Sequence, residues 1–186
     1  MRIGYAICGS FCTISDSLRQ LERIISLGYS VVPFMSERTY STDTRFGRAE
    51  DIRRRVMEIT GEKIVHTVEG AEPYGPNPLD ALIISPCTGN TLAKLASGIT
   101  DGAVTMAAKA HLRCDGRLLI ALASNDGASQ NLKNIAALLT RRSVYFLPMR
   151  QDSPMGKPYS LVADFDRLPE ALLAMENGEQ LRPIFV

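Results

Sequence analysis

The sequence lacks an excess of charge of either sign. Its 21 lysine and arginine residues are balanced by 20 aspartate and glutamate residues, which gives a formal net charge of +1. Proteins that bind nucleic acid normally carry a strong basic excess, so this balance argues against a nucleic-acid partner. No apolar run reaches the roughly 18 residues that span a bilayer, so we expect no membrane partner either.

A signal peptide and a paired-cysteine motif are also missing. The apolar run that ends at Cys8 is too short for the hydrophobic region of a signal peptide, so we expect a cytoplasmic protein. None of the four cysteines, Cys8, Cys12, Cys87 and Cys114, has the two-residue spacing of a zinc knuckle or a redox pair. We therefore expect buried, reduced thiols and no metal site.

What the chain does contain is a series of short apolar runs that alternate with helical patterns. The runs predict strands at residues 3–8, 31–35, 81–84, 117–123 and 144–147. The helical patterns fall at residues 15–27, 48–60, 92–96, 103–112, 132–139 and 168–175. Residues 36–47 are rich in hydroxyls, have no apolar period and are predicted as a long loop. This alternation predicts a single domain, residues 1–186, with a doubly wound parallel sheet in a three-layer α/β/α fold.

In such a sheet, ligands bind beyond the carboxyl ends of the strands, near the point where the strand order reverses. Three segments follow predicted strands there, residues 9–13, 36–47 and 85–91, and all are rich in small and hydroxyl-bearing residues. Such residues suit a phosphate-bearing cofactor. Neither Gly-x-Gly-x-x-Gly nor a P-loop occurs, which disfavours classical NAD and ATP binding and favours a mononucleotide such as FMN.

Residues 86–101, Pro-Cys-Thr-Gly-Asn-Thr-Leu-Ala-Lys-Leu-Ala-Ser-Gly-Ile-Thr-Asp, resemble the Pro-Ala-Ser-Ala-Asn-Thr segment of the flavoprotein (flavin-dependent cysteine decarboxylase) superfamily. Residues 42–47, 71–73, 123–126, 151–154 and 157–158 resemble the B subunits of dipicolinate synthases, and the similarity covers nearly the whole chain. The resemblance implies a Rossmann-like, flavodoxin-like fold and an FMN site. The residues implied to bind the cofactor are Gly9, Ser10, Ser36, Thr88, Asn90, Thr91 and Ser124.

The resemblance also implies catalytic residues, with some departures. Asn125 matches the asparagine of the decarboxylases' Pro-x-Met-Asn clamp, but the proline and methionine of that clamp are missing. Where the decarboxylases have a catalytic histidine, this chain has Glu72 and Pro73, so Glu72 is a candidate general base. These departures weigh against decarboxylation of a peptidyl cysteine and against tight FMN binding.

Dipicolinate synthases form pyridine-2,6-dicarboxylate, an acid of bacterial spores, from a dihydrodipicolinate-level precursor. Their A subunit carries the nicotinamide-binding region, which fits the missing dinucleotide fingerprint here. The resemblance therefore implies a partner that brings NADP, the A subunit, together with a dicarboxylate substrate and the mother-cell cytoplasm of a spore former. Superfamily members assemble as trimers or larger arrays, so a homo-oligomer is expected, and the alanine-rich residues 103–108 could serve it or pack internally.

A dianionic substrate needs fixed donors, and a guanidinium matches a carboxylate in a bidentate manner. Arg45 is therefore the first candidate for substrate binding, followed by Lys157 and Arg38; the alternative is that all three are solvated loop residues. His66 is expected to cap a strand, and a cationic His111 to complement a helix end. Cys87 is either a packing thiol or a nucleophile. Two other functions stay open: an FMN-dependent decarboxylase or flavin prenyltransferase, and a non-catalytic scaffold that activates the A subunit.

Overall fold

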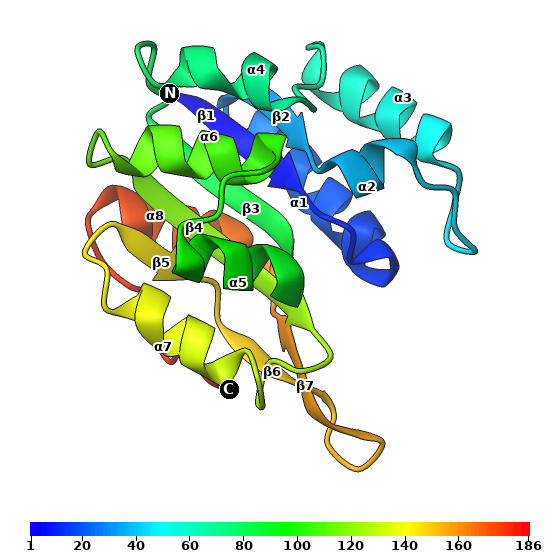
Figure 1. Ribbon diagram of the computed structural model, residues 1–186, viewed down its shortest axis with the longest axis vertical. Helices are drawn as coiled ribbons and strands as arrows, with labels where there is room; N and C mark the ends of the chain where they lie inside the picture. The colour runs from blue at the N-terminus through cyan, green and yellow to red at the C-terminus, as the bar shows by residue number, and fades with distance from the viewer.

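A computed structural model describes residues 1–186 as one twisted sheet between two layers of helices (Figure 1). The strands are β1 (Arg2–Ile7), β2 (Ser30–Met35), β3 (Ala81–Thr88), β4 (Arg117–Ser124), β5 (Val144–Phe146), β6 (Met149–Ser153) and β7 (Lys157–Ala163). The helices are α1 (Ile14–Ser26), α2 (Glu37–Ser41), α3 (Ala49–Thr60), α4 (Val68–Ala71), α5 (Gly89–Ser97), α6 (Ala103–Leu112), α7 (Leu132–Leu139) and α8 (Leu168–Glu176). None of these helices is long and apolar enough to cross a membrane.

The strand order is β2-β1-β3-β4-β7-β6, with β5 also paired to β4. Strands β1 to β5 are parallel, and the order reverses between β1 and β3. Along one edge of β4, residues Leu118–Ile120 pair with β5, whereas Ala123 and Ser124 pair with β7. The predicted α/β/α fold of the flavodoxin-like type is confirmed. The antiparallel β6–β7 hairpin is an addition that the sequence analysis did not predict.

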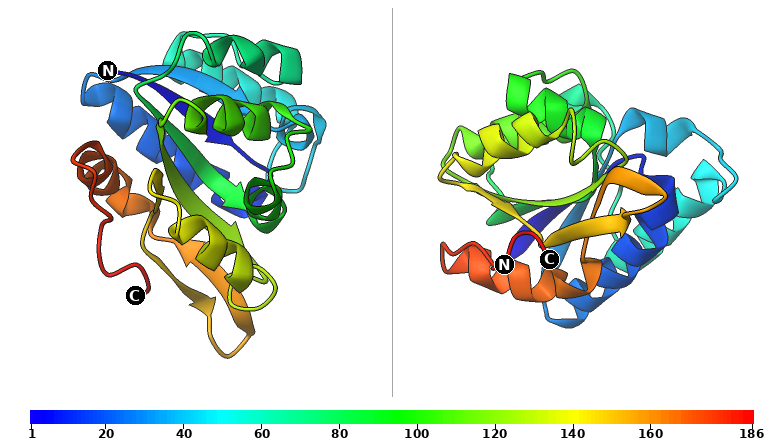
Figure 2. Two further views of the ribbon diagram at one scale, coloured as in Figure 1. Left: turned by 60° about the vertical axis from the view of Figure 1, so that its left-hand side comes forward. Right: turned by 90° about the horizontal axis from the view of Figure 1, so that it is seen from below.

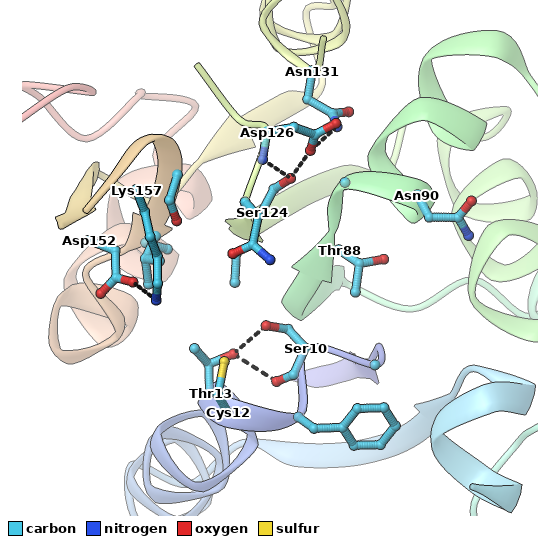
Figure 3. A pocket seen from close by; sticks show the side chains of 18 of the residues that line it. Ser10, Cys12, Thr13, Thr88, Asn90, Ser124, Asp126, Asn131, Asp152 and Lys157 are labelled. Carbon is cyan, nitrogen blue, oxygen red and sulfur yellow. Dashed lines mark hydrogen bonds and ion pairs between the residues drawn. The ribbon is translucent and has the colours of Figure 1, made fainter. Parts of the chain in front are cut away.

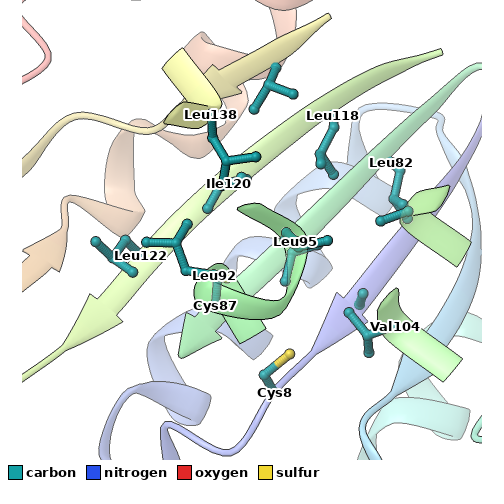
Figure 4. Close-up of a cluster of buried hydrophobic side chains, with 14 of the residues drawn as sticks. Cys8, Leu82, Cys87, Leu92, Leu95, Val104, Leu118, Ile120, Leu122 and Leu138 are labelled. Carbon is teal, nitrogen blue, oxygen red and sulfur yellow. The ribbon is translucent and has the colours of Figure 1, made fainter. Parts of the chain in front are cut away.

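Alternation along the central strand explains the two layers. In β3, Leu82 and Ile84 enter the apolar cluster beneath α5, α6 and α7, whereas Ala81 and Ile83 enter the cluster beneath α1 and α8. Both faces of the strand are therefore buried, which is why it reads as a continuous apolar run. Figure 2 shows the helices on the two sides of the sheet, and Figure 4 shows side chains of the first cluster.

Two segments differ from their predicted form. Residues 36–47 are not a continuous loop, because the side chain of Ser36 accepts a hydrogen bond from the Thr39 N–H and starts the short helix α2. Strand β3 runs four residues beyond its predicted end, since Cys87 and Thr88 continue the pairing with β4. The polar segment after the apolar run is thus partly strand and partly the start of α5.

Cysteine and histidine environments also correct the predictions. Cys8 and Cys87 are buried, as expected, but Cys12 and Cys114 are exposed. His111 is buried; its Nε2 lies 2.9 Å from the Arg117 carbonyl oxygen, and burial lowers its pKa. A cationic His111 at the helix end is therefore wrong, because the low-dielectric environment favours the neutral ring.

His66 and the alanine-rich helix α6 both pack within the chain. His66 directly follows Val65, which forms an isolated bridge with Phe34 of β2. The His66 ring stacks on the ring of Tyr40, with 3.7 Å between the ring centroids. In α6, Ala103, Ala107 and Ala108 are buried among the apolar residues of their own chain. The alanine-rich segment is thus an internal helix contact.

Candidate ligand-binding site

A cavity of about 1310 Å³ lies at the carboxyl ends of β1, β3 and β4, where the strand order reverses (Figure 3). The connections that follow these three strands provide its floor. One wall is formed by α5 and α7, and the opposite wall by the start of α1 and the β6–β7 hairpin. Asn90 and Lys157 lie on these opposite sides in Figure 3. This is the edge at which doubly wound sheets bind ligands.

The connection after β1 presents a hydroxyl to the cavity. The Thr13 hydroxyl donates to both the backbone oxygen and the side-chain oxygen of Ser10, each at 3.0 Å. The Ser10 hydroxyl also lines the cavity, where it can donate to or accept from a ligand. Gly9, directly before it, also lines the cavity and allows close backbone approach.

Thr88 and Thr91 form a series of hydrogen bonds at the start of α5. The Thr91 N–H donates to the Thr88 hydroxyl oxygen at 3.2 Å, and that hydroxyl donates to Thr91 Oγ1 at 3.1 Å. Thr91 Oγ1 in turn donates to Cys8 Sγ at 3.4 Å. Burial raises the pKa of the Cys8 thiol to about 11, so it stays protonated. Both threonine protons are used inside the chain, and the pair acts as a helix cap.

A polar cluster, Ser124, Asp126 and Asn131, follows β4. The Ser124 hydroxyl donates to the Asp126 carboxylate, and Asn131 Nδ2 donates to Asp126 Oδ1 at 2.8 Å. The bond from Ser124, with that from Asn131, holds the pKa of Asp126 below its ordinary value, so the group stays ionised at neutral pH. A Cβ atom at Gly89 would lie only 2.5 Å from both Asn131 Nδ2 and Ser124 Oγ. Glycine at this position therefore lets the start of α5 pack against the cluster.

The charges around the cavity nearly cancel. Arg19 pairs with Asp16 at 2.6 Å, and Lys157 pairs with Asp152 at 2.8 Å, a bond that raises the pKa of Lys157. The remaining lining cations, Lys133 and Arg150, form no ion pair within the chain. The lining carboxylates are Asp16, Asp126, Asp152, Asp164 and Asp166. An anion in this cavity must therefore be held by neutral donors and by individual unpaired cations.

The structure brings together seven of the twelve predicted site residues. Those that line the cavity are Gly9, Ser10, Thr88, Asn90, Ser124, Asn125 and Lys157. Those that do not are Ser36, Arg38, Arg45, Glu72 and Thr91. Neither Asn90 nor Asn125 forms a side-chain hydrogen bond within the chain, so both amides are free for a ligand.

Physical reasons place the other residues elsewhere. Ser36 caps α2, and its hydroxyl lies 2.8 Å from that of Thr39. The exposed Arg45 guanidinium lies 4.8 Å from the centre of the Phe46 ring, which does line the cavity. Glu72 starts a 3-10 turn before β3; Tyr74 of that turn lies beside Arg2 at the amino end of β1, with 5.8 Å between guanidinium and ring centre. Glu72 thus sits at the opposite edge of the sheet.

The lining residues that the sequence analysis did not assign to the site include Asp126, Asn131, Arg150 and Cys12. Asp126 adjoins Asn125 within residues 123–126, which carry part of the family resemblance, so its position is a usable signal. Asn131 and Arg150 reach the cavity only through the fold of the loop after β4 and through the unpredicted hairpin. No local pattern marks either of them.

Fold and site together define an α/β protein of the flavodoxin-like type with a polar ligand cavity at its switch point. The model of the family named Flavoprotein matches residues 1–166. The B subunit of dipicolinate synthase from Bacillus subtilis (strain 168) is 37% identical over 186 residues, which cover 100% of this chain and 93% of that protein. The chain therefore belongs to the Flavoprotein family and, within it, to the dipicolinate synthase B subunits.

Solved structures agree with this assignment. The crystal structure of the B subunit of dipicolinate synthase from Bacillus halodurans C has a TM-score of 0.91 and 39% identity, and the match covers 100% of this chain and 95% of that one. The FMN-dependent cysteine decarboxylase SpaF has a TM-score of 0.72 and 18% identity, covering 96% of this chain and 97% of its own. At that level of identity, the likeness to SpaF shows the fold alone.

Proposed function

We propose that the chain acts as the B subunit of a dipicolinate synthase in the mother-cell cytoplasm of a spore-forming bacterium. With an NADP-binding A subunit, it converts a dihydrodipicolinate-level precursor into pyridine-2,6-dicarboxylate. In that oxidation the ring loses two hydrogens, one as a proton and the other as hydride to NADP⁺ on the A subunit. The observation that carries the proposal is the chain-long identity to two B subunits, 37% and 39%. The missing dinucleotide fingerprint agrees with NADP being held by the partner.

We further propose that the cavity binds FMN, and its lining fits that group. Its volume of about 1310 Å³ is ample for a mononucleotide together with a small acid. Ser10 offers a hydroxyl and Asn90 a free amide, and Gly89 leaves room beside the start of α5. When bound, FMN supplies a ring that accepts or returns a hydride. The chain's own part is to hold the phosphate and ribityl groups with neutral donors.

Asn125 and Lys157 are the predicted catalytic and substrate-binding residues that line the cavity. We propose that the Asn125 amide, which has no partner in the chain, donates a hydrogen bond to the substrate that strengthens in the transition state. Glu72 has no role in this scheme, because it lies at the other edge of the sheet. We also propose a homo-oligomer, as expected from the superfamily.

The test is to reconstitute the two subunits from separate purifications. The mixture with NADP⁺ and the precursor should form dipicolinate at least tenfold faster than the A subunit does without this chain. Equal rates would contradict the catalytic role of this chain. If the Asn125→Ala variant still binds its partner and supports the full rate, the role proposed for Asn125 is contradicted, which is the result that a scaffold would give. Release of carbon dioxide from a peptidyl cysteine, or prenyl transfer to FMN, would instead support the alternative superfamily activities.

A further inference from the structure

Two of the four cationic side chains that line the cavity are already compensated. The guanidinium of Arg19 and the ammonium of Lys157 each bind a carboxylate at less than 3 Å. An incoming anion would have to compete with those carboxylates for either cation. Arg150 and Lys133 have no such partner, and they stand on different walls, Arg150 on β6 and Lys133 on α7.

The sheet register places Arg150 next to the proposed catalytic loop. Arg150 pairs with Val162 of β7, which pairs with Ala123 of β4, two residues before Asn125. Neighbouring strands lie about 4.8 Å apart, so the backbones of Arg150 and Ala123 are roughly 10 Å apart. All three paired residues line the cavity. Because directly paired residues share a face of the sheet, the side chain of Arg150 lies on the same face as those of Val162 and Ala123.

The backbone beside Arg150 is held on both of its edges. On the inner edge, β6 pairs with β7. On the outer edge, the Met149 N–H donates to the Ile184 oxygen at 2.8 Å, and the Val186 N–H donates to the Met149 oxygen at 3.0 Å. The strand that carries Arg150 is thus fixed on both edges.

We propose that Arg150 binds one carboxylate of the dicarboxylate substrate through a bidentate pair of hydrogen bonds. This inference rests on the proposed function and names the residue that selects an acidic substrate. Lys157, the cation predicted from the sequence, is already matched by Asp152. A planar guanidinium fits a carboxylate better than the point charge of Lys133 does. The same chemistry would also bind the FMN phosphate, so the experiment must separate the two ligands.

The experiment measures by calorimetry the binding of dipicolinate to the full chain saturated with FMN. Arg150→Gln should raise the dissociation constant for dipicolinate about tenfold or more, and Arg150→Lys should raise it less, because the bidentate geometry alone is lost. Lys133→Gln removes the same charge from the other wall and should change it less than about threefold. Arg142→Gln, an exposed arginine away from the cavity, should leave it unchanged. The uncharged pyridine-2,6-dicarboxamide should bind Arg150→Gln and the wild type equally.

Three results would overturn the inference: unchanged dipicolinate binding in Arg150→Gln, an equal loss in Lys133→Gln, or no dipicolinate binding by the wild type. A loss of FMN affinity in Arg150→Gln with dipicolinate affinity retained would assign the residue to the phosphate and also overturn it. Circular dichroism checks that each variant is folded. The proposed function is tested separately, by dipicolinate synthesis in the reconstituted subunits. A negative binding result would therefore contradict the role of Arg150 without contradicting the proposed function.

Discussion

Replacing Gly89 by alanine should lower the affinity for FMN at least tenfold and the free energy of unfolding by about 1–3 kcal/mol. Helix propensity alone predicts the opposite sign, because alanine in a helix is favoured over glycine by up to about 1 kcal/mol. The added methyl group would approach Ser124 Oγ and Asn131 Nδ2 to 2.5 Å and Asp126 Oδ1 to 2.9 Å. These atoms hydrogen-bond one another, so relieving the contact means breaking those bonds beside the cavity. Denaturant unfolding and FMN titration measure the two effects.

Gly102→Ala is the control for this substitution. Gly102 precedes α6 away from the cavity, and its nearest neighbour to an added Cβ atom is Thr105 Oγ1 at 4.0 Å. That variant should bind FMN as the wild type does. If Gly89→Ala were as stable as the wild type and bound FMN equally well, the cluster around Asp126 would not shape the cofactor site.

Replacing Asn125 by alanine should reduce dipicolinate formation by the reconstituted subunits about a hundredfold. The amide of Asn125 lines the cavity without a partner in the chain, so it is available to the substrate as a donor. Because the side chain is exposed and makes no internal bond, the fold should not change. The rate at saturating precursor should fall more than the Michaelis constant changes, since the proposed hydrogen bond strengthens in the transition state.

Gln130→Ala is the matched variant, since Gln130 is also an exposed amide that lines the cavity without an internal hydrogen bond. Its rate should stay within about threefold of the wild type. Similar losses in both variants would show a general effect of the cavity surface, and a normal rate in Asn125→Ala would remove Asn125 from the mechanism.

The sequence predicted the part of the site that follows from local pattern. Residues after β1, β3 and β4 reach the cavity because the carboxyl ends of parallel strands share one edge, as for Ser10, Asn90 and Asn125. The same rule explains the misplacement of Glu72. A residue that precedes a central strand lies at the amino edge, and the resemblance to a family histidine carried no information about which edge this chain would use.

Other features depend on contacts between distant residues, which a single sequence does not reveal. The β6–β7 hairpin has exposed polar residues at 150–152 and no apolar alternation, so nothing local marks it as a strand. It forms because β7 continues the sheet beyond the short β5 and pairs with Ala123 and Ser124. Asp126 and Asn131 are close in the sequence, but they meet only because of the conformation of the loop after β4.

The most direct test of the account is an absorption titration of the purified chain with FMN. The cavity at the switch point should take up one FMN per chain, with a perturbed flavin spectrum, and dipicolinate added afterwards should change that spectrum again. Binding is expected to be reversible on gel filtration, as the missing clamp residues indicate. A chain that leaves the FMN spectrum unchanged at millimolar cofactor would contradict the claim that this cavity is a flavin site.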